Sequence, residues 1–226
     1  RQLAARMGDE EFTKATVSGS SADGTDIHTL NMIKAGTGTR AKAKTFLYAF
    51  LFGAGPANIA KQLGLSVSEA KATVKRYRES MPKLDRLLTD LDISWTKRAK
   101  KRFNKKRGQM QLADGWIKGL DGRRIVIDSQ HKVLNYLLQS DEAIQMSHAY
   151  VMVHEEMERL GYVIGEDWNM LIFYHDEVQL EARTLEAVQA CADVACWAIA
   201  QSGVNLGITC PHEGDPKFGM NWKECH

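Results

Sequence analysis

The sequence of 226 residues has no run of eighteen apolar residues, so we expect no membrane-spanning helix and no membrane partner. Its first residues lack the apolar core and small-residue end of a signal peptide. No two of its cysteines form the Cys-x-x-Cys pair typical of a zinc site, which favours free thiols and a cytoplasmic protein. What remains is an ordinary globular composition, long enough for one large domain or two modest ones.

Acidic residues are missing from one stretch, which carries eight cations: Lys97, Arg98, Lys100, Lys101, Arg102, Lys105, Lys106 and Arg107. A solvated helix face usually mixes both signs, and this stretch does not. We therefore expect Lys100, Lys101 and Arg102 to face the phosphates of a nucleic-acid backbone, where cations gain from counterion release. Charge alone fits a basic loop without a partner equally well.

Hydrophobic periodicity predicts an α+β fold that is mostly helical. The expected helices cover 42–53, 56–63, 66–80, 84–91, 132–160 and 185–201. A capping box at 66–69 opens one of them. Two segments, 116–127 and 170–181, alternate like strands and predict hairpins. The pair Asp121-Gly122 suits a type I′ turn in the first hairpin.

A four-residue spacing places Arg40, Lys44, Tyr48 and Phe52 along one stripe of a predicted helix. From Arg40 to Tyr48 the stripe is about 12 Å long, roughly the reach from a nucleotide's terminal phosphate to its base. Cations beside a helix N-terminus favour bound phosphate, and an aromatic ring two turns on offers a stacking face. The alternative is a solvated Arg/Lys face beside core aromatics, which spacing alone favours.

The segment His175-Asp176-Glu177 stands at the predicted corner of the second hairpin. Two adjacent carboxylates flanked by apolar strands are costly unless they bind a cation or meet solvent. Carboxylate oxygens suit Mg²⁺, and two such ions can hold the attacking and leaving oxygens of a phosphoryl transfer. Such a site needs one more carboxylate, and none stands beside the turn in the sequence, so an exposed acidic turn is the alternative.

A third set, His131, Asn135 and Gln139, shares the four-residue spacing on the helix after the first hairpin. Amide side chains on one face can hydrogen-bond base edges or sugars. The same pattern also fits the solvated side of a helix.

Together these segments resemble family A DNA polymerases, with the closest likeness to bacteriophage replicative members. The four-residue spacing from Arg40 to Phe52 resembles motif B, the nucleotide-binding helix of that family's fingers. The run Tyr-His-Asp-Glu-Val at 174–178 resembles motif C. Further likenesses follow in the family's order along nearly the whole chain, at 26–29, 43–46, 53–55, 116–123, 137–140 and 219–226.

The resemblance implies a palm–fingers module of a DNA-directed DNA polymerase that acts in DNA replication. By this likeness 1–9 would be a palm remnant, 10–132 the fingers subdomain and 133–226 the C-terminal part of the palm. Motif A, whose aspartate bridges both metal ions, normally lies just upstream, so we expect Arg1 to mark a cut in a longer chain. The thumb and any 3′–5′ exonuclease would belong to the same upstream portion. We expect negligible nucleotidyl transfer from this chain alone.

The resemblance also implies roles in nucleotide binding. Arg40 and Lys44 would bind the triphosphate of the incoming dNTP, with Lys44 as a catalytic proton donor to the leaving pyrophosphate. His28 would contact the same phosphates, and Tyr48 would pack against the sugar and base. Phe52 stands where the family commonly has Tyr, which removes a hydroxyl near the templating base.

For metal and DNA, the resemblance implies that Asp176 ligates two catalytic Mg²⁺ ions with Glu177 beside it. The second bridging carboxylate would come from the missing motif A. The primer terminus and minor groove would be contacted by His131, Asn135, Gln139 and His175. The expected partners are primer–template DNA, dNTP and the upstream polymerase portion.

Two other functions fit parts of the sequence. Residues 56–78 read much like a helix-turn-helix, which would make the chain a non-enzymatic DNA-binding module. That hypothesis predicts sequence-specific duplex binding that Mg²⁺ and dNTP do not affect. A degenerate remnant that only folds or pairs with another subunit is the third hypothesis, although joint retention of the motif B and motif C residues argues against drift.

Overall fold

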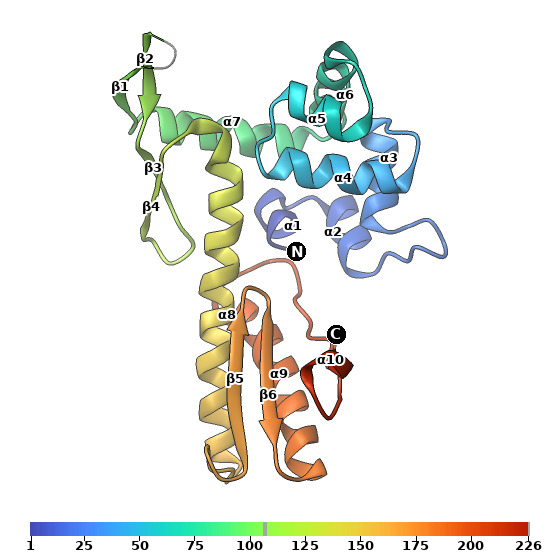
Figure 1. The fold of residues 1–226 in the computed structure, drawn as a ribbon, viewed down its shortest axis with the longest axis vertical. Helices are drawn as coiled ribbons and strands as arrows, with labels where there is room; N and C mark the ends of the chain where they lie inside the picture. The colour runs from blue at the N-terminus through green and yellow to red at the C-terminus, as the bar shows by residue number, and fades with distance from the viewer. Residues whose placement is uncertain (106–107, 226) are drawn as a thin grey trace. The chain divides into compact units, whose positions relative to one another are not determined.

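The computed structural model describes residues 1–105 and 108–225, which form helices and three separate two-stranded antiparallel sheets (Figure 1). The chain divides into two compact units, Arg1–Ser140 and Asp141–His226. The expected α+β fold class is confirmed. Within the described ranges, no helix combines the length and hydropathy that a bilayer span requires.

Short helices with well-defined ends make up most of the first unit. They are α1 (Gln2–Met7), α2 (Glu10–Val17), α3 (Ile27–Ala35), α4 (Arg40–Leu51), α5 (Pro56–Leu63), α6 (Val67–Ser80) and α7 (Pro82–Thr96). Four of them begin with a side chain that accepts a bond from the backbone N–H three residues on: Asp9, Asp26, Thr39 and Ser66. Ser66 and Glu69 form the predicted capping box. Because Thr39 caps α4, that helix begins two residues before the predicted position 42.

Aromatic residues hold α4 against α6. Phe46 and Tyr77 are fully buried, and their ring centroids lie 5.1 Å apart in an edge-to-face arrangement. Phe50 makes a second edge contact with Tyr77 at 5.3 Å. The Tyr77 hydroxyl donates to Oδ1 of buried Asn31 on α3, at 2.6 Å. The helix with the predicted phosphate-binding residues is therefore fixed from its buried side.

The predicted hairpin at 116–127 is present as β3 (Gly115–Lys118) and β4 (Arg124–Ile127), but its predicted turn is wrong. The Gly119 N–H donates to the Arg123 carbonyl at 2.8 Å, so three residues form the loop rather than two. A type I′ turn needs positive φ at both central residues, whereas here Gly122 alone in the loop has it, at 86°. The Asp121 carboxylate instead accepts a bond from the Arg123 backbone N–H.

A second hairpin, β1 (Lys100–Asn104) with β2 (Gln109–Ala113), was not predicted from the sequence. It contains most of the basic stretch, of which Lys106 and Arg107 lie outside the described residues. His226, at the end of the last predicted family likeness, also lies outside them. In Figure 1 this hairpin lies beyond the end of α7 that is remote from α5 and α6.

The predicted helix at 132–160 is present as α8 (Val133–Arg159), preceded by a 3₁₀ turn, η1 (Gln130–Lys132). His131 therefore belongs to the 3₁₀ turn and not to the same helix as Asn135 and Gln139, which corrects the predicted placement. Nearby, the indole N–H of fully buried Trp95 donates to the Ile127 carbonyl at 3.0 Å. That bond ties α7 to β4.

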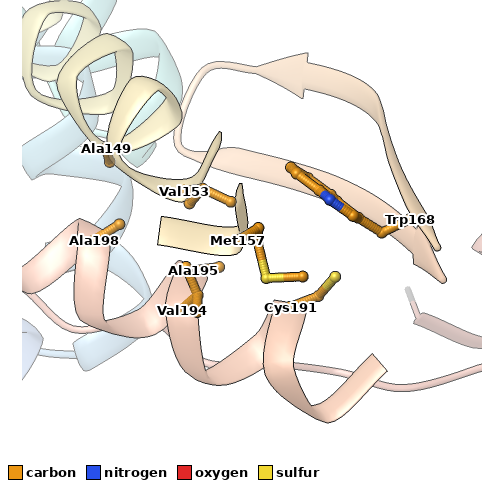
Figure 2. Packing of buried hydrophobic residues seen from close by; sticks show 8 residues of the cluster. All are labelled: Ala149, Val153, Met157, Trp168, Cys191, Val194, Ala195 and Ala198. Atoms are coloured by element: carbon orange, nitrogen blue, oxygen red, sulfur yellow. The ribbon is translucent and has the colours of Figure 1, made fainter. Parts of the chain in front are cut away.

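The second unit pairs a hairpin with long helices. Its elements are the later part of α8, β5 (Trp168–Tyr174), β6 (Glu177–Ala182), α9 (Leu185–Asn205) and α10 (Trp222–Cys225). Figure 2 shows its core, in which Met157 of α8 lies between Cys191 of α9 and Trp168 of β5. The hairpin predicted at 170–181 is confirmed. The four cysteines are free thiols, as expected.

Candidate nucleotide-binding site and acidic turn

Arg40, the first residue of α4, is held by Asp26, which caps α3. The guanidinium Nη2 and Nε lie 2.5 and 3.1 Å from Oδ2 of Asp26. Asp26 is only 7% exposed, and the same carboxylate accepts bonds from the Thr29 backbone N–H and hydroxyl. Arg40 holds the pKa of Asp26 well below its usual range. One ionised carboxylate thus caps α3 and fixes the direction of a cation on α4.

His28 lies on the first turn of α3, beside these charges. Its ring centroid is 6.5 Å from that of Tyr48. Its Nδ1 is buried and has no hydrogen-bond partner among the described residues. Burial, and then the charges of Arg40 and Lys44, lower the pKa of His28. The lowered pKa favours the neutral imidazole near physiological pH, and its Nδ1 has an unused hydrogen-bonding position.

The predicted stripe on α4 lies on the exposed face of the helix. Arg40 and Lys44 are exposed, and Tyr48 and Phe52 are 47% and 56% exposed. The opposite face carries buried Ala43, Phe46, Leu47 and Ala49. Core packing therefore does not explain Tyr48 and Phe52, and the core-aromatic alternative is wrong. Two cations, of which Arg40 is paired with Asp26, and two aromatic rings thus lie on one exposed surface.

A hollow of about 460 Å³ lies at the C-terminal end of α4. Its lining includes Tyr48, Phe52, Asn58, Gln62 and His131. Gly53 makes the close approach of two segments possible, because a Cβ there would lie 1.8 Å from the His131 carbonyl oxygen. Gly53 also has a φ of +72°, which favours glycine.

Asn58 and Gln62 were not singled out from the sequence. They stand four residues apart on α5, and the Gln62 amide donates to Asn58 Oδ1 at 3.4 Å. That spacing was the only available signal, and it is common on solvated helices. Asn135 and Gln139 lie on α8, with Asn135 half-buried and Gln139 exposed.

In the second unit, β5 and β6 meet at the turn predicted from the sequence. His175 has a φ of +53°, and Asp176 beside it is exposed. Glu177 begins β6, and its Oε1 accepts a bond from the Gln179 amide at 2.7 Å. Among the described residues, no group of three His, Cys, Asp or Glu side chains is arranged to hold a metal ion.

Glu142 of α8 is a further carboxylate of the second unit that the sequence did not suggest. Burial, followed by the negative charge of Asp176, raises its pKa. No local spacing connects Glu142 to the turn, because the two are more than thirty residues apart. An acidic neighbour of Asp176 is thus present within the second unit.

Comparisons with known proteins agree on one family. Residues 1–224 match the model of DNA polymerase family A. The chain is 33% identical over 224 residues to the DNA-directed DNA polymerase of Enterobacteria phage T3 and 32% identical to that of Escherichia phage T7. Each alignment covers 98% of this chain and 31% of the relative, so the chain spans about a third of their length.

A solved structure extends the likeness to the fold. It is described as the POL domain of Pol1 from M. smegmatis in complex with DNA primer-template and dNTP. The TM-score is 0.67 at 18% identity, with 89% of this chain and 34% of the other covered. At that identity the likeness establishes the fold alone.

Proposed function

Because this chain belongs to DNA polymerase family A, we propose that it supplies the nucleotide-binding and part of the metal-binding machinery of a DNA-directed DNA polymerase. The observation that carries the proposal is the exposed face of α4, where Arg40 is held in place by Asp26 and lies near His28 and Lys44. In this proposal 1–9 are a palm remnant, 10–132 the fingers and 133–226 the C-terminal part of the palm.

The incoming dNTP would lie along α4. Arg40 and Lys44 would bind its triphosphate, helped by the free N–H groups of the helix start. Neutral His28 can donate one hydrogen bond to a phosphate oxygen without adding charge. Tyr48 would pack against the sugar and base, with Phe52 near the templating base. Lys44 would give a proton to the leaving pyrophosphate.

Asp176 and Glu177 have the oxygen donors that Mg²⁺ prefers, and Asp176 is open to solvent. Two carboxylates make an incomplete set for two ions, so the second bridging carboxylate would come from an upstream portion with motif A. When bound, the ions would stabilise the negative charge on the attacking and leaving oxygens of the phosphoryl transfer. We propose that the isolated chain therefore has negligible polymerase activity.

Primer–template DNA is the second proposed ligand. His131, Asn135, Gln139 and His175 would contact the primer terminus and minor groove. Lys100, Lys101 and Arg102, on an exposed strand of the basic hairpin, would face phosphates. The family match does not favour the helix-turn-helix hypothesis, because α5 and α6 fall inside the segment matched by the polymerase family.

Binding of a dye-labelled dNTP with Mg²⁺, followed by fluorescence anisotropy, tests the nucleotide site on this chain alone. Arg40→Ala and Lys44→Ala should each weaken binding about tenfold or more, since charge-assisted bonds to phosphate are lost. Lys42→Ala is the matched control, because Lys42 lies on the same helix and borders a different hollow. Equal affinities for Lys44→Ala and Lys42→Ala would contradict the proposed site.

Primer extension tests the activity. The chain should extend a primed template only when mixed with a separately made upstream portion that carries motif A, and Asp176→Ala should abolish extension in that mixture. Extension by the chain alone at the rate of the mixture would refute the proposed division of the metal site.

A further inference from the structure

We propose that the β1–β2 hairpin is a binding arm for unpaired DNA, in which Phe103 stacks on a base while the neighbouring lysines contact phosphates. The bound strand would be the single-stranded template ahead of the primer. This identity of the strand rests on the proposed function. The inference goes beyond the contact of basic residues with phosphates, because it assigns an aromatic face and a preference for single strands.

The strand register sorts the hairpin into two faces. Lys101 pairs with Leu112, and Phe103 pairs with Met110, so these four side chains share one face. Phe103, Met110 and Leu112 are 56%, 57% and 37% exposed. The face is therefore apolar, carries a lysine, and is not covered by the described part of the chain.

The other face is polar and basic. It carries Lys100, Arg102 and Asn104, and the Asn104 amide donates to Gln111 Oε1 at 2.8 Å. Arg102 lies 3.4 Å from Asp114, which is the one ion pair of this hairpin among the described residues. Within the described part of the chain, Lys100 and Lys101 have no ion pair, which favours a polyanion as partner.

More positive charge lies at the base of the hairpin. The guanidinium groups of Arg98 and Arg124 lie 4.4 and 4.8 Å from the centroid of the Trp116 rings. Cation–π contacts therefore hold both cations in place, and neither cation has an ion pair among the described residues. A strand bound to the arm could continue along this basic surface.

Single-stranded DNA fits both faces better than a duplex does. A duplex would satisfy the cations but leave Phe103, Met110 and Leu112 facing water. Unpaired bases expose flat apolar faces that stack on aromatic side chains whatever their sequence, while the backbone follows the cations. An isolated two-stranded hairpin is only marginally stable, so a bound strand would also help to order this arm.

Anisotropy with a dye-labelled oligothymidine, without dNTP or Mg²⁺, tests the inference on the whole chain. Phe103→Ala should weaken binding about 5- to 150-fold, as expected for the loss of one stacked base, and Phe103→Trp should keep it. The double variant Lys100→Ala, Lys101→Ala should reduce the slope of log affinity against log salt by about 1.4. Val204→Ala is the control, since Val204 is an exposed apolar residue of α9 and lies outside the hairpin and its basic surface.

Primed templates identify the strand. Phe103→Ala should weaken binding of a template with a long 5′ overhang and leave a blunt duplex unaffected. Unchanged oligothymidine binding by Phe103→Ala, an equal loss of blunt-duplex binding by Phe103→Ala, or equal competition by polyglutamate would each overturn the inference. The dNTP site on α4 is measured separately, so its failure would refute the proposed function and leave the strand-binding result standing.

Discussion

Removing the hydroxyl of Tyr77 should destabilise the first unit by a predictable amount. Tyr77 is fully buried, and its hydroxyl donates to Asn31 Oδ1 at 2.6 Å. Tyr77→Phe keeps the ring and its edge contacts with Phe46 and Phe50. The substitution leaves the oxygen of Asn31 buried without this donor, while the Asn31 amide still donates to the Ile27 carbonyl.

A buried acceptor that loses its donor costs about 1–3 kcal/mol. For a chain of this size, each kcal/mol lowers the melting temperature by roughly 2–4 °C, so we expect a fall of about 2–12 °C. Urea unfolding followed by far-UV circular dichroism at pH 7 gives the free energy directly. Combining Tyr77→Phe with Asn31→Leu should recover part of the loss, because both partners are then apolar.

The same pair predicts a dependence on pH. Burial raises the pKa of Tyr77 well above its usual range, whereas the phenol has a pKa of about 10 in the unfolded chain. The stabilisation by Tyr77 is therefore complete below pH ~10 and is lost as the pH rises further. The difference between wild type and Tyr77→Phe should shrink at pH 10.5–11. A loss of unfolding free energy below about 0.5 kcal/mol at pH 7 would refute the reasoning, because a buried unsatisfied acceptor should cost more than that. A loss that does not shrink at high pH would refute it as well.

Two further predictions concern the ion pair beside the nucleotide site and the core of the second unit. Asp26→Asn keeps a good cap for α3 but loses the charged bonds to Arg40. Because Arg40 lowers the pKa of Asp26, the advantage of wild type is complete above pH ~4 and declines as the pH falls from there toward the lowered pKa of the folded state. The difference between the urea midpoints of the two proteins should therefore be largest at pH 7 and should shrink steadily below pH ~4. Met157 is fully buried, so Met157→Ala should lower the free energy of urea unfolding by about 2–5 kcal/mol. Met157→Leu nearly keeps the volume of the side chain and should cost less than about 1.5 kcal/mol. Equal losses for the two variants would contradict a tightly packed core.

Local chemistry explains which elements were predictable. The capping box at Ser66 and the proline-to-glycine span of α5 act within a few residues, so their helix ends followed from the sequence. The β1–β2 hairpin did not, because its lysine-rich strand has little β propensity and depends on pairing across the turn. The three-residue loop at Gly122 was missed for a similar reason, since strand register decides loop length.

The sequence by itself determined the family, the order of its motifs and the residues that share the exposed face of α4, because those depend on residue type and helical spacing. Only the tertiary structure decided which distant segments meet. Asp26 and Arg40 are fourteen residues apart and bonded, and the His131 carbonyl packs on Gly53. Such contacts follow from how helices pack around buried residues such as Phe46 and Tyr77, and no local pattern encodes that packing.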